Sequence, residues 1–195
     1  MLKFYWIAVA VVALDQVTKL TAKYLVVHPI EVAPFLNLVL ILNKGAAFGL
    51  SLGLPSDWQN FLFAIIALIV SFVIIAMVRR LGANDVQVLV GLMLVLGGAV
   101  GNFIDRFRLQ GVVDFVDFYY RSWSWLDIPG LDMVYCHLPN SRGDWHVYAN
   151  DVFHCHWPAF NVADSAITVG AILLVLDALG LGFRKRHRPA TPPYV

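Results

Sequence analysis

The sequence predicts an α-helical membrane protein with four transmembrane helices, a small extracytoplasmic β element and a long insertion loop. Hydrophobic residue types make up 59% of its 195 residues, charged types make up only 14%, and the mean hydropathy is +0.71. The apolar residues come in runs long enough to cross about 30 Å of hydrocarbon at about 1.5 Å per residue. This composition excludes an ordinary soluble domain.

Two apolar runs are the clearest transmembrane helices. Residues 61–78 contain Ser71 as their only polar residue, and residues 86–104 contain only Gln87 and Asn102. Since the runs have no charged residue, both are expected to cross the membrane as the second and third helices.

The first and last helices are more polar. Residues 4–27 form the predicted first helix, and residues 163–183 form the fourth, which has Asp164 at its start. Lys3 and the eleven apolar residues that follow it also resemble a secretory signal sequence. Beyond Leu14, however, the polar residues fall at helical spacing and not at a cleavage site, so we expect the first helix to be retained.

The remaining segments are connections, of which one is long. Branched and aromatic residues at 31–42 predict one or two short strands. We expect residues 1–188 to form a single four-helix domain, with an extracytoplasmic insertion at about 121–153. The tail at 189–195 has three prolines and is expected to be disordered.

Basic residues predict the orientation in the membrane. If four helices alternate in direction, the basic residues near the helix ends fall on one side, which the positive-inside rule places in the cytoplasm. Both termini are then cytoplasmic, and the long connection at 105–160 faces outward. No basic patch with interleaved aromatic residues indicates a nucleic-acid partner. The residues that set this orientation are Lys3, Arg79, Arg80, Arg184, Lys185, Arg186 and Arg188.

A polar stripe lies on the first helix. Asp15, Lys19 and Lys23 recur every four residues and therefore share one face, and Asp15 precedes Lys19 in the orientation that favours an ion pair. The stripe is expected to face the bundle. Either it is a buried ion pair that joins helices, or it contacts substrate directly.

A second polar group ends the third helix. Asn102, Asp105 and Arg106 stand at i, i+3 and i+4, and a structural role is favoured for them. The guanidinium of Arg106 is expected to hold a carboxylate, either that of Asp105 or one of the pair Asp114 and Asp164, and to lower its pKa. The preceding small residues, Gly97, Gly98 and Gly101, predict close helix packing.

Asp114 and Asp164 are acids beside apolar helices. A carboxylate near hydrocarbon costs several kcal/mol unless it is paired, hydrated or protonated. Taken separately, Asp114 reads as an acid in a loop or at a strand end, and Asp164 as a helix-start residue that follows Asn161 by three positions. Asp117 is an alternative to Asp114. Taken together, the two acids suggest a shared proton.

Five sequence blocks resemble the lipoprotein signal peptidases, also called signal peptidase II. They occur in the family's order and cover the helical framework except for the second helix. The blocks are DQVTK at 15–19, NKGAAFG at 43–49, GGAVGNFIDR at 97–106, VVDFVDF at 112–118 and FNVADSAI at 160–167.

This resemblance implies a bacterial inner-membrane aspartyl peptidase with its active site near the periplasmic face. Such an enzyme removes the signal peptide of a prolipoprotein just before its diacylglyceryl-modified cysteine, needs no cofactor or metal, and is inhibited by cyclic peptides of the globomycin type. The implied catalytic dyad is Asp114 and Asp164. The positions implied to bind substrate or support the site are Asp15, Lys19, Asn43, Gly98, Asn102, Asp105, Arg106, Asn161 and Ala163.

The chain departs from the family pattern between the two catalytic aspartates, which are separated by the insertion. The insertion either contacts substrate as a lid or is a solvated addition. Cys136 and Cys155 are expected on the outward side, where an oxidising compartment permits a disulfide. The alternative is a metal site, although the spacing of these cysteines and the neighbouring histidines matches no common zinc signature.

A non-enzymatic membrane protein whose polar residues merely hold helices together remains an alternative. A transporter is disfavoured, because no inverted repeat or pair of broken helices is visible. A serine protease is disfavoured because Ser165 has no G-x-S-x-G setting.

Overall fold

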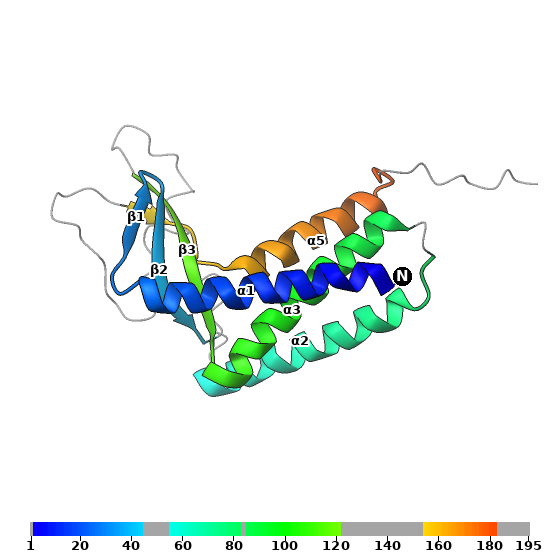
Figure 1. Ribbon diagram of the computed structural model, residues 1–195, viewed down its shortest axis with the longest axis horizontal. Coiled ribbons are helices and arrows are strands. Elements are labelled where there is room, and N and C mark those ends of the chain that lie inside the picture. Colours follow the sequence, from blue (N-terminus) through cyan, green and yellow to red (C-terminus); the bar gives the residue numbers. More distant parts are fainter. Residues whose placement is uncertain (1, 45–54, 83–84, 122–153, 183–195) are drawn as a thin grey trace, which may run out of the picture.

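The computed structural model describes residues 2–44, 55–82, 85–121 and 154–182 and has a bundle of helices with a small sheet at one end (Figure 1). A short 3₁₀ turn, η1, leads into the first helix. Successive long helices run in alternating directions, so the N-terminus and the end of the last helix lie away from the sheet. The helices are α1 (Tyr5–Leu25), α2 (Ser56–Val78), α3 (Val86–Leu109) and α5 (Val162–Ala178).

Three helical segments are long and apolar enough to cross a membrane: Leu2–Leu25, Ser56–Val78 and Val86–Leu109. They correspond to the first three spans predicted from the sequence. The fourth helix, α5, is 17 residues long. At about 1.5 Å per residue it is somewhat shorter than the hydrocarbon core, so its span stays a prediction.

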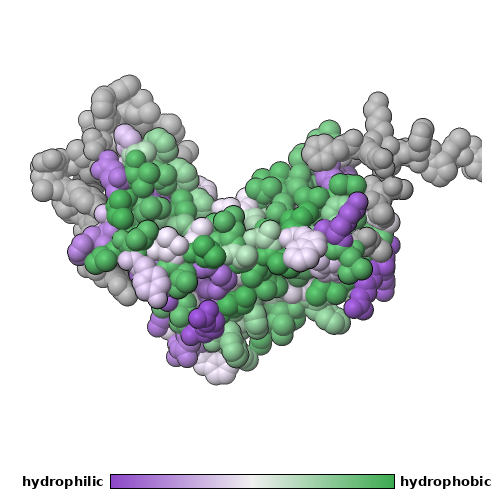
Figure 2. Space-filling view, viewed as in Figure 1, coloured by the Kyte–Doolittle hydropathy of each residue, from purple (hydrophilic) through white to green (hydrophobic). Residues whose placement is uncertain are grey.

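Helix α3 is the centre of the bundle and packs against α1, α2 and α5. Leu89 and Met93 on α3 are fully buried in an apolar cluster that also contains Phe4 and Val78. By contrast, large apolar side chains such as Phe72 of α2 are exposed. Figure 2 shows this hydrophobic surface over the helices, as expected where lipid replaces water.

Glycines allow α3 to approach its neighbours closely, as predicted. A Cβ on Gly97 would lie 2.9 Å from the carbonyl oxygen of Ala8 in α1. A Cβ on Gly98 would collide with the carbonyl oxygen of Ala163 in α5. Small residues at these crossings therefore bring α1 and α5 onto α3 at the level where the polar residues begin.

The sheet is antiparallel, in the order β1-β2-β3-β4. The strands expected at 31–42 are present, but the sheet is larger than predicted. Sequence VVDFVDFYY was interpreted only as a loop or strand end, whereas it forms the longest strand. The strands are β1 (Ile30–Ala33), β2 (Leu36–Asn43), β3 (Val112–Arg121) and β4 (His154–His156).

Several predictions concern residues that the structure does not describe. Most of the insertion, the C-terminal tail and Cys136 lie outside the described residues. Both interpretations of the Cys136 and Cys155 pair therefore stay predictions.

Candidate active site

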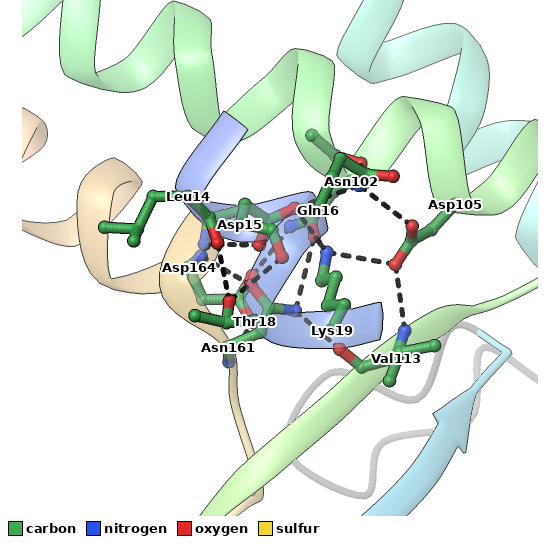
Figure 3. Close-up of polar contacts among 12 residues, drawn as sticks. Leu14, Asp15, Gln16, Thr18, Lys19, Asn102, Asp105, Val113, Asn161 and Asp164 are labelled. Atoms are coloured by element: carbon green, nitrogen blue, oxygen red, sulfur yellow. Dashed lines mark hydrogen bonds and ion pairs between the residues drawn. The ribbon is translucent and has the colours of Figure 1, made fainter. Parts of the chain in front are cut away.

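The polar residues of α1 and α3 meet in a buried ion-pair cluster (Figure 3). The Nζ atom of Lys19 lies 2.9 Å from Asp15 Oδ2 and 3.0 Å from Asp105 Oδ2, and it donates to Asn102 Oδ1 at 3.0 Å. Asp15 is fully buried, and Lys19 and Asp105 are nearly so. We call Asp15, Lys19 and Asp105 the charged cluster. Of the predicted polar stripe, Lys23 alone is exposed and lies outside it.

Gln16 also binds this cluster, although the sequence analysis did not single it out. Its Nε2 donates to Asp15 Oδ2 at 3.2 Å and to Asp105 Oδ1 at 3.1 Å. The sequence does indicate this position, because Gln16 stands three residues before Lys19 and therefore lies next to it on the same helix face.

The charged cluster also holds both neighbouring segments in place. Asp15 Oδ1 accepts a hydrogen bond from the backbone N–H of Ala163 at 2.9 Å, at the start of α5. Asp105 Oδ2 accepts from the backbone N–H of Val113 at 3.1 Å, at the start of β3. The cluster thus fixes the two chain segments that carry Asp164 and Asp114.

Of the partners expected for Arg106, Asp105 pairs with Lys19 instead, while Asp164 and Asp114 are close enough for their charges to act on the guanidinium. The carboxylate of Asp105 is bound by Lys19, and Arg106 forms no ion pair among the described residues. Its guanidinium lies 5.1 Å from the ring centroid of Phe63, and its buried Nη1 has no hydrogen-bond partner in the described part of the chain. The spacing within α3 could not show that Asp105 points toward α1.

Asp164 is held at the start of α5 by a capping box. Its backbone N–H donates to Asn161 Oδ1 at 3.0 Å, and its Oδ2 accepts from the backbone N–H of Asn161 at 3.2 Å. The other carboxylate oxygen, Oδ1, accepts from Asn102 Nδ2 at 2.8 Å. The helix-start interpretation of Asp164 is therefore correct, and its side chain also reaches Asn102 of α3.

Asp114 lies on β3 and is almost completely buried. Its Oδ1 accepts from Asn161 Nδ2 at 2.7 Å, and its Oδ2 accepts from Asn43 Nδ2 at 3.1 Å. Asn161 therefore contacts both acids, one through its side-chain amide and the other through the capping box. This shared residue brings Asp114 and Asp164 into one site.

Backbone pairing explains how β3 reaches α5. The segment before α5 pairs with β3, where Val116 N–H donates to the Phe160 carbonyl at 2.9 Å and Phe160 N–H donates back at 3.0 Å. Asn161 follows directly, so this pair of bonds sets its position beside Asp114.

Asp117, the alternative acid, points elsewhere. It stands three positions after Asp114, and since side chains alternate along a strand, the two lie on opposite faces of β3. Asp117 pairs across the sheet with Asn37, whose Nδ2 donates to its Oδ2 at 3.3 Å.

The surroundings of Asp114 favour its protonated form. Burial, followed by the nearby carboxylate of Asp164, raises the pKa of Asp114 to about 7, while hydrogen bonds from Asn43 and Asn161 and the charge of Lys19 act in the opposite direction. A carboxyl group with this pKa can give or take a proton near neutral pH. Within the described ranges, no group of three or more metal-binding side chains occurs.

The chain matches one known protein family over most of its length. The family model for signal peptidase (SPase) II matches residues 7–180. The lipoprotein signal peptidase of Coxiella burnetii (strain RSA 493 / Nine Mile phase I) is 37% identical over 176 residues, which are 89% of this chain and 88% of that protein. That of Paraburkholderia phytofirmans is 38% identical over 180 residues, or 89% of this chain and 84% of the relative.

A solved structure agrees with this match. A bacterial membrane enzyme determined by the in meso method at 2.3 Å resolution superposes with a TM-score of 0.66 and 28% sequence identity. The alignment covers 98% of this chain and 96% of that one.

Proposed function

Because the chain belongs to the signal peptidase II family, whose members are lipoprotein signal peptidases of bacterial membranes, we propose that it is an aspartyl endopeptidase with Asp114 and Asp164 as its catalytic dyad. Its substrate is a prolipoprotein carrying a diacylglyceryl-modified cysteine. Cleavage occurs just before that cysteine and releases the signal peptide.

One observation carries the proposal: Asn161 contacts both carboxylates, while the nearest lysine is paired with other acids. Two neighbouring carboxylates that form no ion pair with a described residue cannot both ionise cheaply, so one keeps a proton. The raised pKa of Asp114 supports this view. The proton belongs to the pair and not to one named residue.

The reaction then needs only water and the dyad. The ionised carboxylate removes a proton from a water molecule, whose oxygen attacks the scissile carbonyl. The protonated carboxyl group donates its proton to the carbonyl oxygen. When the C–N bond breaks, the leaving amine takes a proton from the dyad, and no acyl-enzyme is formed.

The neighbouring amides position the dyad during these steps. Asn43, Asn102 and Asn161 donate hydrogen bonds to its carboxylate oxygens. We assign the other predicted residues supporting roles: Asp15, Lys19 and Asp105 hold α5 and β3, Gly98 and Ala163 form the close crossing, and Arg106 lies near enough to interact with the dyad charges.

We propose that the enzyme lies in the inner membrane with both termini in the cytoplasm and the sheet on the periplasmic side. The alternating helices, and Lys3, Arg79 and Arg80 at the end of the bundle opposite the sheet, support this orientation (Figure 1). Helix α5 would be the fourth span, with Asp164 at its periplasmic end.

The direct test is to incubate the purified protein with a diacylglyceryl-modified precursor and, in parallel, with the same precursor unmodified. We expect cleavage of the modified precursor alone, at the bond before the modified cysteine, and inhibition by a globomycin-type cyclic peptide. Absence of cleavage together with insensitivity to the cyclic peptide would support a non-enzymatic role instead.

A further inference from the structure

A cavity of about 240 Å³ lies between α1 and α3 at the sheet end of the bundle. Neither Asp114 nor Asp164 lines it. Lys19 and Asp105 do, and their ion pair stands between the cavity and the dyad. The complete lining is Gln16, Val17, Lys19, Leu20, Lys23, Asp105, Arg108, Leu109 and Val113.

Two cations of this cavity have no acidic partner among the described residues. Lys23 of α1 and Arg108 of α3 are exposed, and neither forms an ion pair with any residue that the structure describes. Lys19, in contrast, is neutralised by Asp15 and Asp105. The Asp105 carboxylate is bound by Lys19, Gln16 and the Val113 backbone N–H. It therefore does not neutralise Lys23 or Arg108, which are available to bind an anionic ligand.

Three apolar side chains of the lining are exposed on the outer surface of the bundle, where lipid would lie. Val17 and Leu20 on α1 are 61% and 55% exposed, and Leu109 on α3 is partly exposed. Figure 2 shows hydrophilic side chains interrupting the hydrophobic surface where α1 meets the sheet. A ligand at this place meets positive charge at the end of the helices and apolar side chains along their length.

We infer that this cavity binds the phosphate of an anionic phospholipid, with Lys23 and Arg108 contacting the head group and the acyl chains lying along Val17 and Leu20. On the cytoplasmic side of membranes, basic pockets between helices bind anionic head groups, and the same charge attraction acts in a basic pocket at the opposite interface. A phosphodiester matches both the donors of the guanidinium and the point charge of the ammonium. A free phosphate ion would leave the apolar walls without a partner.

The bound lipid would link α1 to α3 on the lipid side of the Lys19–Asp105 pair. A ligand that binds only the folded protein raises its thermal stability. We therefore expect phosphatidylglycerol to raise the unfolding temperature of the detergent-solubilised protein, whereas inorganic phosphate should have no effect.

Native mass spectrometry of the purified protein tests the inference without using catalysis, so its result does not depend on the proposed peptidase activity. The protein is mixed with phosphatidylglycerol, phosphatidylcholine or diacylglycerol in equal amounts. We expect one phosphatidylglycerol to be retained in preference to the other two. The Lys23→Gln/Arg108→Gln variant should retain it about 30-fold more weakly, since each basic residue contributes roughly 1 kcal/mol and 1.4 kcal/mol is tenfold.

The matched control is Arg79→Gln/Arg80→Gln, which removes the same charge from exposed residues at the opposite end of the bundle. This variant should retain phosphatidylglycerol like the wild type, and Lys23→Arg should do so as well. Equal retention by the wild type and the cavity variant would overturn the inference. So would an equal loss in the control, equal retention of diacylglycerol, or displacement of the lipid by inorganic phosphate.

Discussion

The charged cluster and the Asp114–Asp164 pair are both built from buried carboxylates, but their charges are balanced in different ways. In the cluster, Lys19 lies within 3.0 Å of both Asp15 and Asp105. In the pair, the observed hydrogen-bond donors are neutral amides and backbone N–H groups. An acid with a lysine partner is stabilised in its ionised form, whereas two acids held by amides retain a proton between them. The first arrangement suits structure and the second suits catalysis.

The largest expected effect is on catalysis at the pair. Asp114→Asn or Asp164→Asn should lower cleavage of a lipid-modified precursor by roughly 10³-fold or more, as expected when a general acid–base group is lost. Both variants should still insert and fold, because the charged cluster is untouched. The measurement is single-turnover cleavage, with circular dichroism as the control for folding. Normal turnover by either variant would refute the dyad.

The next effect should appear in stability, at the cluster. Lys19→Met leaves Asp15 and Asp105 buried without a cation, and breaking a buried pair in this way costs about 3–5 kcal/mol. Lys23→Met, one turn along the same helix but exposed, should change the free energy of unfolding by no more than about 0.5 kcal/mol in lipid-free detergent. Chemical unfolding of the two variants measures this difference. Equal losses in the free energy of unfolding would show that the ion pairs of Lys19 do not stabilise the protein.

A smaller effect on stability is expected at the crossing of α3 and α5, which lies between the charged cluster and the Asp114–Asp164 pair. A methyl group on Gly98 collides with the Ala163 carbonyl, whereas one on Gly91 meets the Gly170 carbonyl at 3.0 Å. Gly98→Ala should therefore cost about 1–3 kcal/mol by overpacking, and Gly91→Ala less. Gly98→Ala should also reduce activity, because it moves Asp164 away from Asn102. Thermal unfolding and precursor cleavage are measured on both variants. A loss of stability in Gly91→Ala as large as in Gly98→Ala would contradict this expectation.

The smallest effect should come from Asp117→Asn. Asp117 lies on the opposite face of β3, and an asparagine there can still accept the hydrogen bond from Asn37. Most of the cleavage activity should remain, with a stability change of no more than about 1 kcal/mol. Complete inactivity of this variant alone would mean that the wrong acid of β3 has been assigned.

The sequence predicted what depends on neighbours along one helix. The spacing of Asp15 and Lys19 predicted their ion pair, and the spacing of Asn161 and Asp164 predicted a helix start. These features depend on contacts three or four residues apart, which the helix geometry sets directly.

The features that the sequence could not predict depend on contacts between distant segments. Asp105 binds Lys19 instead of Arg106 because α1 crosses α3 at Gly101, and no spacing within one helix reveals that crossing. Strand β3 was missed because Val112, Val113, Asp114 and Phe115 are all buried. A strand covered on both faces lacks the alternation by which strands are recognised.

The proposed mechanism depends most on Asp114 and Asp164 sharing a proton near neutral pH. Infrared titration of the carboxylic-acid band in the purified protein tests it most directly. The wild type and Asp117→Asn should show a band that disappears as the pH rises through about 7. Because the proton belongs to the pair, this transition should be shifted or missing in both Asp114→Asn and Asp164→Asn. A wild-type protein without a protonated carboxyl group between pH 5 and 7, or an unchanged band in Asp114→Asn, would contradict the account.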